Sequence, residues 1–267
     1  MVTKKAVIKP EPDYFYPELD RIAAAIQRHA KPELIQELRG REGREVSGSL
    51  SDSVLLEKLA QIIAYSQGAK SKLVDKMLKE GCFNVAFAGF DIDKVSEMNP
   101  CLVVDSHWNF ISSIRQKTKI FQIVMAARSI KKNGGLCQLW NESEIPTRIH
   151  TLADIENFWR GFETLQSALK LVDVPFLHST TSLLHFMLHI GYDCIKPDTI
   201  VVQVAQRLKM GSGNTNKQLK DIVQIVQQYA LRRKIRPSLV DLYMLIDGRQ
   251  TWAEDFVDPT YYDAQTS

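Results

Sequence analysis

The stretch that decides the fold is Leu171–Leu208, which reads LVDVPFLHSTTSLLHFMLHIGYDCIKPDTIVVQVAQRL. A polar turn that ends at Thr181 opens an apolar helical segment, and a glycine turn closes it. An extended connector containing Pro197 then leads to a second amphipathic helix, which we expect to begin near Asp198. A carboxylate at a helix N-terminus directly after an X-Pro pair is either a helix cap or a positioned reactive group. The stretch therefore predicts two helices joined by a turn, with a candidate reactive residue at the start of the second.

Outward from this stretch, apolar residues recur at helical spacing along most of the chain. Ser51 or Ser53 is expected to cap one helix and Thr151 another. The other predicted helices cover residues 18–26, 32–38, 51–65, 70–80, 91–99, about 108–131, 151–171, 219–232 and 237–246. No segment sustains the apolar and polar alternation of a strand. The sequence therefore predicts an all-α protein in which many helices of modest length pack at steep angles.

Three segments interrupt the helical pattern. Residues 1–17 contain several prolines and aromatics without periodicity, and we expect an arm laid over the surface. Residues 39–53 are rich in glycine, serine and charge, which predicts a linker, and residues 211–214 predict a loop. The expected organisation is an N-terminal arm with short helices that pack with the C-terminal part (1–50), a central helical module that ends in the hairpin (51–190), and the Asp198 helix with the C-terminal helices (191–267).

The composition is that of an ordinary globular protein. The 267 residues are 45% hydrophobic and 24% charged, and the net charge of +3 neither demands nor excludes nucleic acid. The longest apolar runs, such as Ile120–Ala127, are far shorter than the roughly 20 residues that a bilayer requires. Residues 10–13 interrupt any signal-peptide core. We expect no membrane partner and a cytoplasmic location, associated with the nucleoid if the protein is bacterial.

The cysteine and histidine spacings favour structural roles. The four cysteines, Cys82, Cys101, Cys137 and Cys194, form no CxxC pair, which disfavours a disulfide framework and a four-cysteine zinc site. His185 and His189 lie one helical turn apart and could chelate a metal with Cys194 as a third ligand. The alternative is that both are core histidines, which the apolar helix and the absence of a glutamate favour. We expect no metal and no organic cofactor.

Two stretches resemble the helix-hairpin-helix superfamily of DNA glycosylases. A glutamine in a short corner of that superfamily enters the duplex beside the lesion, and Ala64-Tyr65-Ser66-Gln67 is similar to this corner. FDIDKVSEM (90–98) and RQKTKIFQIVMAARSI (115–130) together resemble a pattern of the 3-methyladenine glycosylase I branch. The matching positions are Phe90, Asp91, Lys94, Val95, Met98, Lys119, Ile120, Ala127 and Arg128. The resemblance implies two helical subdomains flanking a cleft, with a helix-hairpin-helix element.

The strongest part of the resemblance is GYDCIKPDTIV, residues 191–201. It is similar to the superfamily's stretch in which an aspartate starts the helix after the hairpin. Carried over, Asp198 is the catalytic carboxylate and Lys196 a DNA contact. Cleavage of a base-sugar bond develops positive charge on the sugar. A fixed carboxylate either stabilises this charge or orients a water molecule that attacks the sugar. The target base must first leave the stack, and Gln67 is the implied wedge that fills the gap.

The hairpin departs from the family pattern. Phe176 and His178 stand where the family has two glycines that let backbone amides approach a DNA phosphate. The following Ser179, Thr180 and Thr181 could instead donate to a phosphate from a helix N-terminus. Thr180 also replaces the lysine that bifunctional members use for strand cleavage, which implies an enzyme without lyase activity. The Cys/His zinc clasp of the 3-methyladenine branch has no counterpart in this sequence.

Each of these residues also has a purely structural interpretation. Asp198 could be an N-cap alone, and Gln67 a simple turn residue. Trp108 and Trp159 could line a base pocket by stacking, although tryptophans more often pack in cores. Three basic clusters could follow a phosphate backbone if they converge, and are otherwise solvated helix faces. These clusters are Lys70/Lys72/Lys76, Arg115/Lys117/Lys119 and Arg232/Arg233/Lys234/Arg236.

Three functions follow in order of preference. The first is a monomeric, monofunctional DNA glycosylase that removes a damaged, alkylated base from double-stranded DNA in base excision repair. The second is a DNA-binding or adaptor protein that keeps the fold without the chemistry, which the altered hairpin motivates. The third is an interaction module with no nucleic-acid role.

Overall fold

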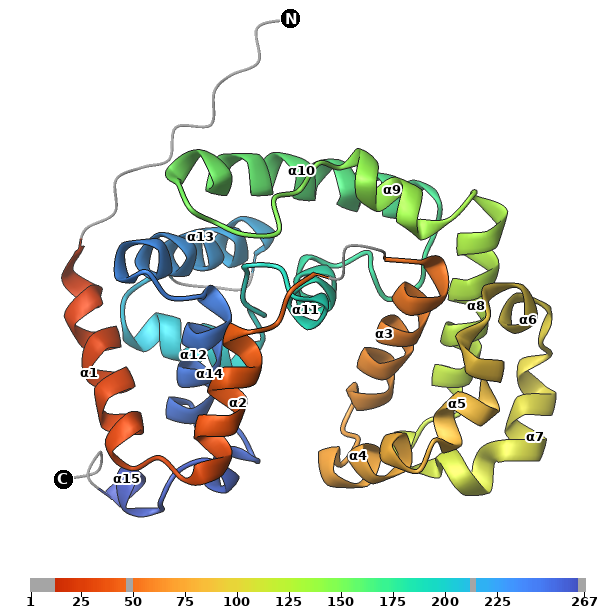
Figure 1. Cartoon of the computed structure of the whole chain (residues 1–267), viewed down its shortest axis with the longest axis horizontal. Coiled ribbons are helices and arrows are strands. Elements are labelled where there is room, and N and C mark those ends of the chain that lie inside the picture. The colour runs from red at the N-terminus through yellow and green to blue at the C-terminus, as the bar shows by residue number, and fades with distance from the viewer. Residues whose placement is uncertain (1–12, 47–49, 212–214, 264–267) are drawn as a thin grey trace, which may run out of the picture. The chain divides into compact units, whose positions relative to one another are not determined.

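The structure is a computed structural model that describes residues 13–46, 50–211 and 215–263 (Figure 1). Helices provide nearly all of the regular structure in these ranges, and no β-strand occurs within them. An isolated antiparallel bridge joins Ala30 and Val257. The predicted all-α class is therefore confirmed. The predicted arm (1–17) and the predicted loop (211–214) fall largely outside the described residues, as does part of the predicted linker.

Contacts within the chain divide it into two compact units. Unit 1 consists of Met1–Val46, Pro146–Arg160 and Gly191–Ser267, and unit 2 consists of Ser47–Ile145 and Gly161–Ile190. The expected central module of residues 51–190 is therefore split, because residues 146–160 group with the two ends of the chain. Nothing in the sequence pattern marks these fifteen positions as different from their neighbours.

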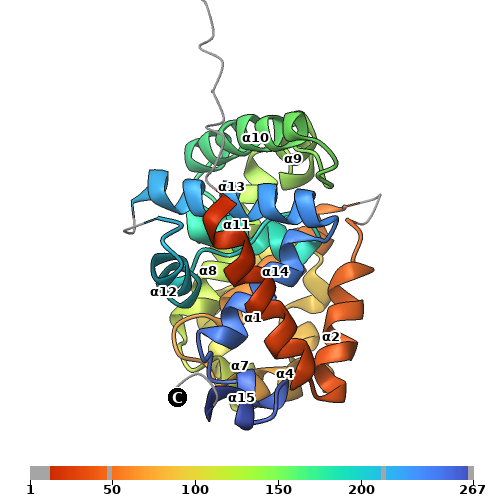
Figure 2. The ribbon, with the colours of Figure 1, turned by 90° about the vertical axis from the view of Figure 1, so that its left-hand side faces the viewer.

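Unit 1 is built around helix α14 (Pro237–Asp247), which is buried at every position. A helix that is buried on all sides must be surrounded, and α1, α2, α12 and α13 each contact α14 (Figure 2). The elements of this unit are η1 (Asp13–Phe15), α1 (Tyr16–Arg28), α2 (Pro32–Glu42), the first part of α10 (Leu152–Leu171), α12 (Thr199–Arg207), α13 (Asn216–Arg233), α14, η4 (Ala253–Asp255) and α15 (Thr260–Asp263).

Unit 2 is built around α3 (Asp52–Tyr65), which contacts α4, α6, α8, α9 and α11. Ser51 caps α3 by accepting a hydrogen bond from the Val54 amide, as predicted. The other elements are α4 (Ser71–Lys79), α5 (Cys82–Ala86), η2 (Ala88–Phe90), α6 (Ile92–Glu97), α7 (Pro100–Ile111), η3 (Ser112–Ile114), α8 (Thr118–Lys132), α9 (Leu136–Glu142), the second part of α10, and α11 (Thr180–Ile190).

The helix boundaries differ from the prediction at several places, including the predicted helix of about 108–131, which the structure divides into the end of α7, η3 and α8. Helix α2 continues to Glu42, so the predicted linker does not begin at Arg39. Pro100 was expected to stop a helix, but it opens α7, because Asn99 caps that helix and proline fits its first turn. The short helices α5 and α9 were not predicted. Within the described ranges, no helix combines the length and apolar character needed to cross a bilayer.

Candidate functional site

Asp198 is the N-cap of α12. Its Oδ1 accepts hydrogen bonds from the amides of Ile200 and Val201, each at 3.1 Å. Its Oδ2 lies 3.3 Å from Nζ of Lys196, and 19% of the side chain is exposed. The capping interpretation is therefore correct as far as Oδ1 is concerned. The second oxygen faces Lys196, and a catalytic role for Asp198 stays a prediction.

A buried acidic residue supports the turn that carries Asp198. Asp241 on α14 accepts a hydrogen bond from the Lys196 amide at 2.9 Å through Oδ1. Its Oδ2 accepts another from Nη1 of Arg41 at 3.0 Å. Burial raises the pKa of the Asp241 carboxyl, Arg41 and the Lys196 amide oppose this effect, and the charge of Asp198 adds to it. The backbone before Asp198 is thus tied to the core helix of unit 1.

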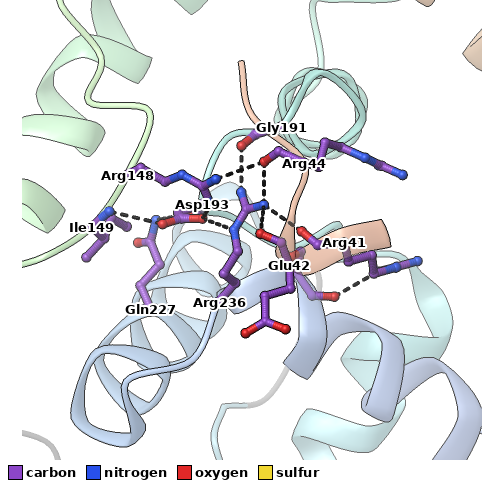
Figure 3. A network of polar contacts seen from close by, with 10 residues as sticks. Arg41, Glu42, Arg44, Arg148, Ile149, Gly191, Asp193, Gln227 and Arg236 are labelled. Atoms are coloured by element: carbon purple, nitrogen blue, oxygen red, sulfur yellow. Dashed lines mark hydrogen bonds and ion pairs between the residues drawn. The ribbon is translucent and has the colours of Figure 1, made fainter. Parts of the chain in front are cut away.

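Arg236 holds the segments of unit 1 together just before this turn (Figure 3). Its Nε donates to Oδ1 of Asp193 at 2.8 Å, and its Nη2 donates to the Gly191 carbonyl at 2.7 Å. Its Nη1 donates to the carbonyls of Arg41 and Arg44, both at 2.6 Å. Such a fork of donors gives each nitrogen of the buried guanidinium a partner.

Asp193 extends the same network. Its Oδ2 accepts a hydrogen bond from the Ile149 amide at 3.0 Å, and Nη1 of Arg148 lies 3.5 Å from Oδ1. Its carbonyl accepts from the side chain of Gln227 at 2.9 Å (Figure 3). Residues from four distant parts of the sequence are therefore fixed around one aspartate and one arginine. Neither residue was predicted from the sequence to have this structural role.

Gln67 lies at the exposed corner that follows α3, in unit 2. It adopts a left-handed backbone conformation with φ of 51°, and Gly68 follows with φ of 76°. Nζ of Lys119 donates to the carbonyls of Ala64 at 3.1 Å and Ser66 at 2.5 Å. Nη1 of Arg115 donates to the Gly68 carbonyl at 2.7 Å. The carbonyls on both sides of Gln67 are thus held by cations.

Two of the three predicted basic clusters meet at this corner. The contact from Arg115 to Gly68 joins the second cluster to the corner, and η3 contacts α4, which carries the first. Lys70 and Lys117 are exposed, and Nζ of Lys117 lies 5.5 Å from the centre of the Trp108 ring. Lys119 is the exception, because its side chain is fully buried. We call the exposed set Gln67, Lys70, Arg115 and Lys117 the basic corner.

The third cluster is divided between the surface and the interior, because Arg232, Arg233 and Lys234 are exposed and Arg236 is not. Arg236 is buried in the network described above. Arg233 pairs with Asp20, and Arg232 lies 5.3 Å from the centre of the Tyr16 ring. These arginines of unit 1 therefore serve packing and ion pairing.

The hairpin residues Phe176–Thr181 belong to unit 2. Ser179 caps α11, because its Oγ accepts a hydrogen bond from the Ser182 amide at 3.1 Å. Thr180 is buried, and its Oγ1 accepts from Gln166 at 3.3 Å, so this hydroxyl faces the interior rather than a phosphate. Thr181 is partly exposed. The role of the two outer hydroxyl residues as phosphate contacts stays a prediction.

Phe176 takes φ of 74°, the left-handed conformation that glycine adopts most readily. The backbone is therefore glycine-like at this position, although the residue is a partly exposed phenylalanine. His178, the other residue at an expected glycine position, has no such backbone conformation.

The two candidate tryptophans have different surroundings. Trp159 is buried in unit 1, and its Nε1 donates to Oε1 of Gln227 at 2.9 Å. This position favours core packing over a base pocket. Trp108 on α7 is partly exposed beside Lys117, and stacking on a base stays a prediction for it.

The predicted site residues fall into both units. Asp198, Lys196 and Trp159 belong to unit 1, whereas Gln67, Trp108 and Ser179–Thr181 belong to unit 2. No group of three metal-binding side chains occurs among the described residues, and His189 contacts Gln61 at 3.3 Å. Comparisons with protein-family models, curated proteins and solved structures found no match. The resemblance to DNA glycosylases therefore rests on the sequence motifs alone.

Proposed function

We propose that the protein is a monofunctional DNA glycosylase that hydrolyses the N-glycosidic bond of an alkylated base in duplex DNA. The observation that carries the proposal is the fixed orientation of the Asp198 carboxylate. Two backbone amides fix Oδ1, and Lys196 stands 3.3 Å from Oδ2, so the group is oriented before any ligand arrives. A carboxylate held in this way needs little reorganisation when positive charge develops nearby.

The reaction requires a leaving base and a water molecule. As the bond between base and sugar breaks, its electron pair leaves with the base, and the sugar becomes an oxocarbenium ion. Oδ2 of Asp198 stabilises this charge or accepts the proton of the attacking water. Thr180 stands at the position of the family's lysine and is buried, so no Schiff base and no strand cleavage are expected.

The basic corner supplies the proposed DNA contact. Its three cations suit the phosphate backbone, and exposed Gln67 suits the gap that an extruded base leaves. Extrusion costs a few kcal/mol, and a side chain that fills the gap offsets part of that cost.

A base-release assay tests the proposal. Duplexes that carry 3-methyladenine or 7-methylguanine are incubated with the wild type and with Asp198→Asn, and free base is separated and quantified. We expect release by the wild type and a loss of about 10²–10³-fold or more in the variant, since a preorganised electrostatic group is removed. Release of no base from either duplex, or equal release by the two proteins, contradicts the proposal.

A DNA-binding protein without chemistry is the second candidate. The phenyl ring of Phe176 at the glycine-like position of the hairpin favours it, because it obstructs the phosphate contact that glycosylases of the family make. This candidate predicts duplex binding that weakens steeply with salt, with no release of any base. Binding isotherms at several salt concentrations, with base release measured in the same samples, separate the two.

A further inference from the structure

Two cationic side chains from one short segment hold the corner at residues 66–68. Arg115 and Lys119 lie on either side of the start of α8. Lys119 binds the Ser66 carbonyl, which precedes Gln67, and Arg115 binds the Gly68 carbonyl, which follows it. The peptide that precedes Gln67 and the peptide that follows Gly68 are therefore held by side chains that are distant in sequence.

The side chain of Lys119 is inaccessible to a ligand. Its side chain is 0% exposed, so it cannot contact DNA directly. Burial lowers the pKa of Lys119 to about 8, which shows how strongly the interior disfavours its charge. Its described partners are the terminal carbonyls of α3, which carry the negative end of the helix dipole. A buried ammonium carries a desolvation penalty that a neutral capping group avoids. Capping of α3 alone therefore does not explain why a charged residue stands at this position.

The corner at residues 66–68 also adopts an uncommon backbone conformation. Gln67 has φ of 51° and Arg115 has φ of 68°, although neither is glycine. Residues other than glycine are strained in the left-handed region and persist there only where surrounding contacts hold them. Glycine at position 67 would relieve the conformation but would remove the side chain that the corner presents.

We infer that Lys119 is a positioning residue for Gln67: it fixes the Ala64 and Ser66 carbonyls so that the Gln67 side chain is directed into a gap in duplex DNA. The inference rests on the proposed function only in that Gln67 contacts DNA. Lys119 itself contributes no DNA contact, so its effect on binding must pass through the corner.

A double-mutant cycle tests this coupling. The variants are Gln67→Ala, Lys119→Met and the double variant, and fluorescence anisotropy measures the preference for a duplex with a tetrahydrofuran abasic site over an intact duplex. We expect Gln67→Ala to reduce this preference about 10-fold and Lys119→Met about 5-fold, while the double variant stays within about 2-fold of Gln67→Ala alone.

Arg128→Met is the matched control. Arg128 also lies on α8, and it also donates to two carbonyls, those of Ser96 at 2.9 Å and Met98 at 2.7 Å, but away from the corner. It should leave the preference unchanged. If Lys119→Met does not fold, Lys119→Gln, which keeps a donor, replaces it in the same cycle.

The outcomes separate the inference from the proposed function. Additive losses, or an equal loss with Arg128→Met, overturn the inference even if base release is intact. Coupled losses without base release sustain the inference and overturn the glycosylase. A wild type that shows no preference for the abasic duplex overturns the inference, because Gln67 then fills no gap.

Discussion

Two aspartates cap helices in the same way but in different surroundings. Oδ1 of Asp91 accepts hydrogen bonds from the amides of Asp93 and Lys94, just as Oδ1 of Asp198 accepts two amides of its own helix. Each Oδ2 also faces a lysine, at 3.7 Å for Asp91 and 3.3 Å for Asp198. Capping geometry alone therefore does not distinguish a reactive aspartate from a structural one.

The difference lies in burial and support. The Asp91 side chain is 45% exposed, whereas that of Asp198 is 19% exposed. The turn before Asp198 is also tied to buried Asp241, and the segment before that turn is tied to Arg236. A carboxylate held on a rigid, drier scaffold is the better candidate for stabilising developing charge. Asp91 is the internal control for Asp198.

The largest effect on stability is expected from Arg236→Met, which removes the support on the Asp198 side. Asp193 would be left buried without its main cation, and the contacts to the carbonyls of Arg41, Glu42, Arg44 and Gly191 would be lost. We expect the free energy of unfolding to fall by about 3–5 kcal/mol. Urea denaturation measures this value.

Arg233→Met is the control for that experiment. Arg233 pairs with Asp20 at the surface, where both side chains are substantially exposed. Its loss should lower the free energy of unfolding far less than Arg236→Met does, because an exposed ion pair contributes little. Equal losses in the two variants would mean that the network around Arg236 contributes no special stability.

A smaller effect is expected from removing either cap. Asp198→Ala and Asp91→Ala each leave two helix amides without their acceptor. Asp198→Ala should lower the free energy of unfolding by about 0.5–2 kcal/mol, and Asp91→Ala should lower it as well. Thermal and urea unfolding of both variants measure these costs. Similar values would show that the two residues are equivalent as caps, and a large difference would show that burial changes the value of the cap itself.

The smallest effect concerns pH. The hydrogen bond from the Lys94 amide, helped by that from Asp93, lowers the pKa of Asp91 below its ordinary value of 3.8. Since the folded state then binds the proton more weakly than the unfolded chain, this group stabilises the fold above pH 3.8 and loses its contribution as pH falls through the folded pKa. The stability advantage of wild type over Asp91→Asn should therefore shrink below pH 3.8. An advantage that stays constant down to pH 2 contradicts the pKa direction.

The helix starts could be predicted because their causes are local. Ser51, Thr151 and Asp198 each accept a hydrogen bond from an amide two or three residues later, so the signal lies within one turn of sequence. Pro100 was misjudged because proline fits both after a helix and at the first turn of one. Asn99 directly before it was the signal that could have decided between them.

The supporting residues could not be predicted in the same way. Arg236 contacts carbonyls nearly 200 positions earlier, and Lys119 contacts carbonyls more than 50 positions earlier. Arg236 also follows three basic residues that remain outside its buried network. The local sequence therefore does not distinguish the buried arginine from its exposed basic neighbours. The position of Asp193 could have predicted a buried cation, since a carboxylate in the apolar run before Ile195 needs such a partner. The partner could come only from the tertiary structure.

The most direct test of the central claim is the single-turnover rate of base release from a methylated duplex, measured for wild type, Asp198→Asn and Asp91→Asn. Excess protein removes differences in product release and isolates the chemical step. The account predicts a rate about 10²–10³-fold or more lower for Asp198→Asn and within about 2-fold of wild type for Asp91→Asn. Equal rates for the two variants would contradict it, because the supported aspartate would then be no more than a helix cap.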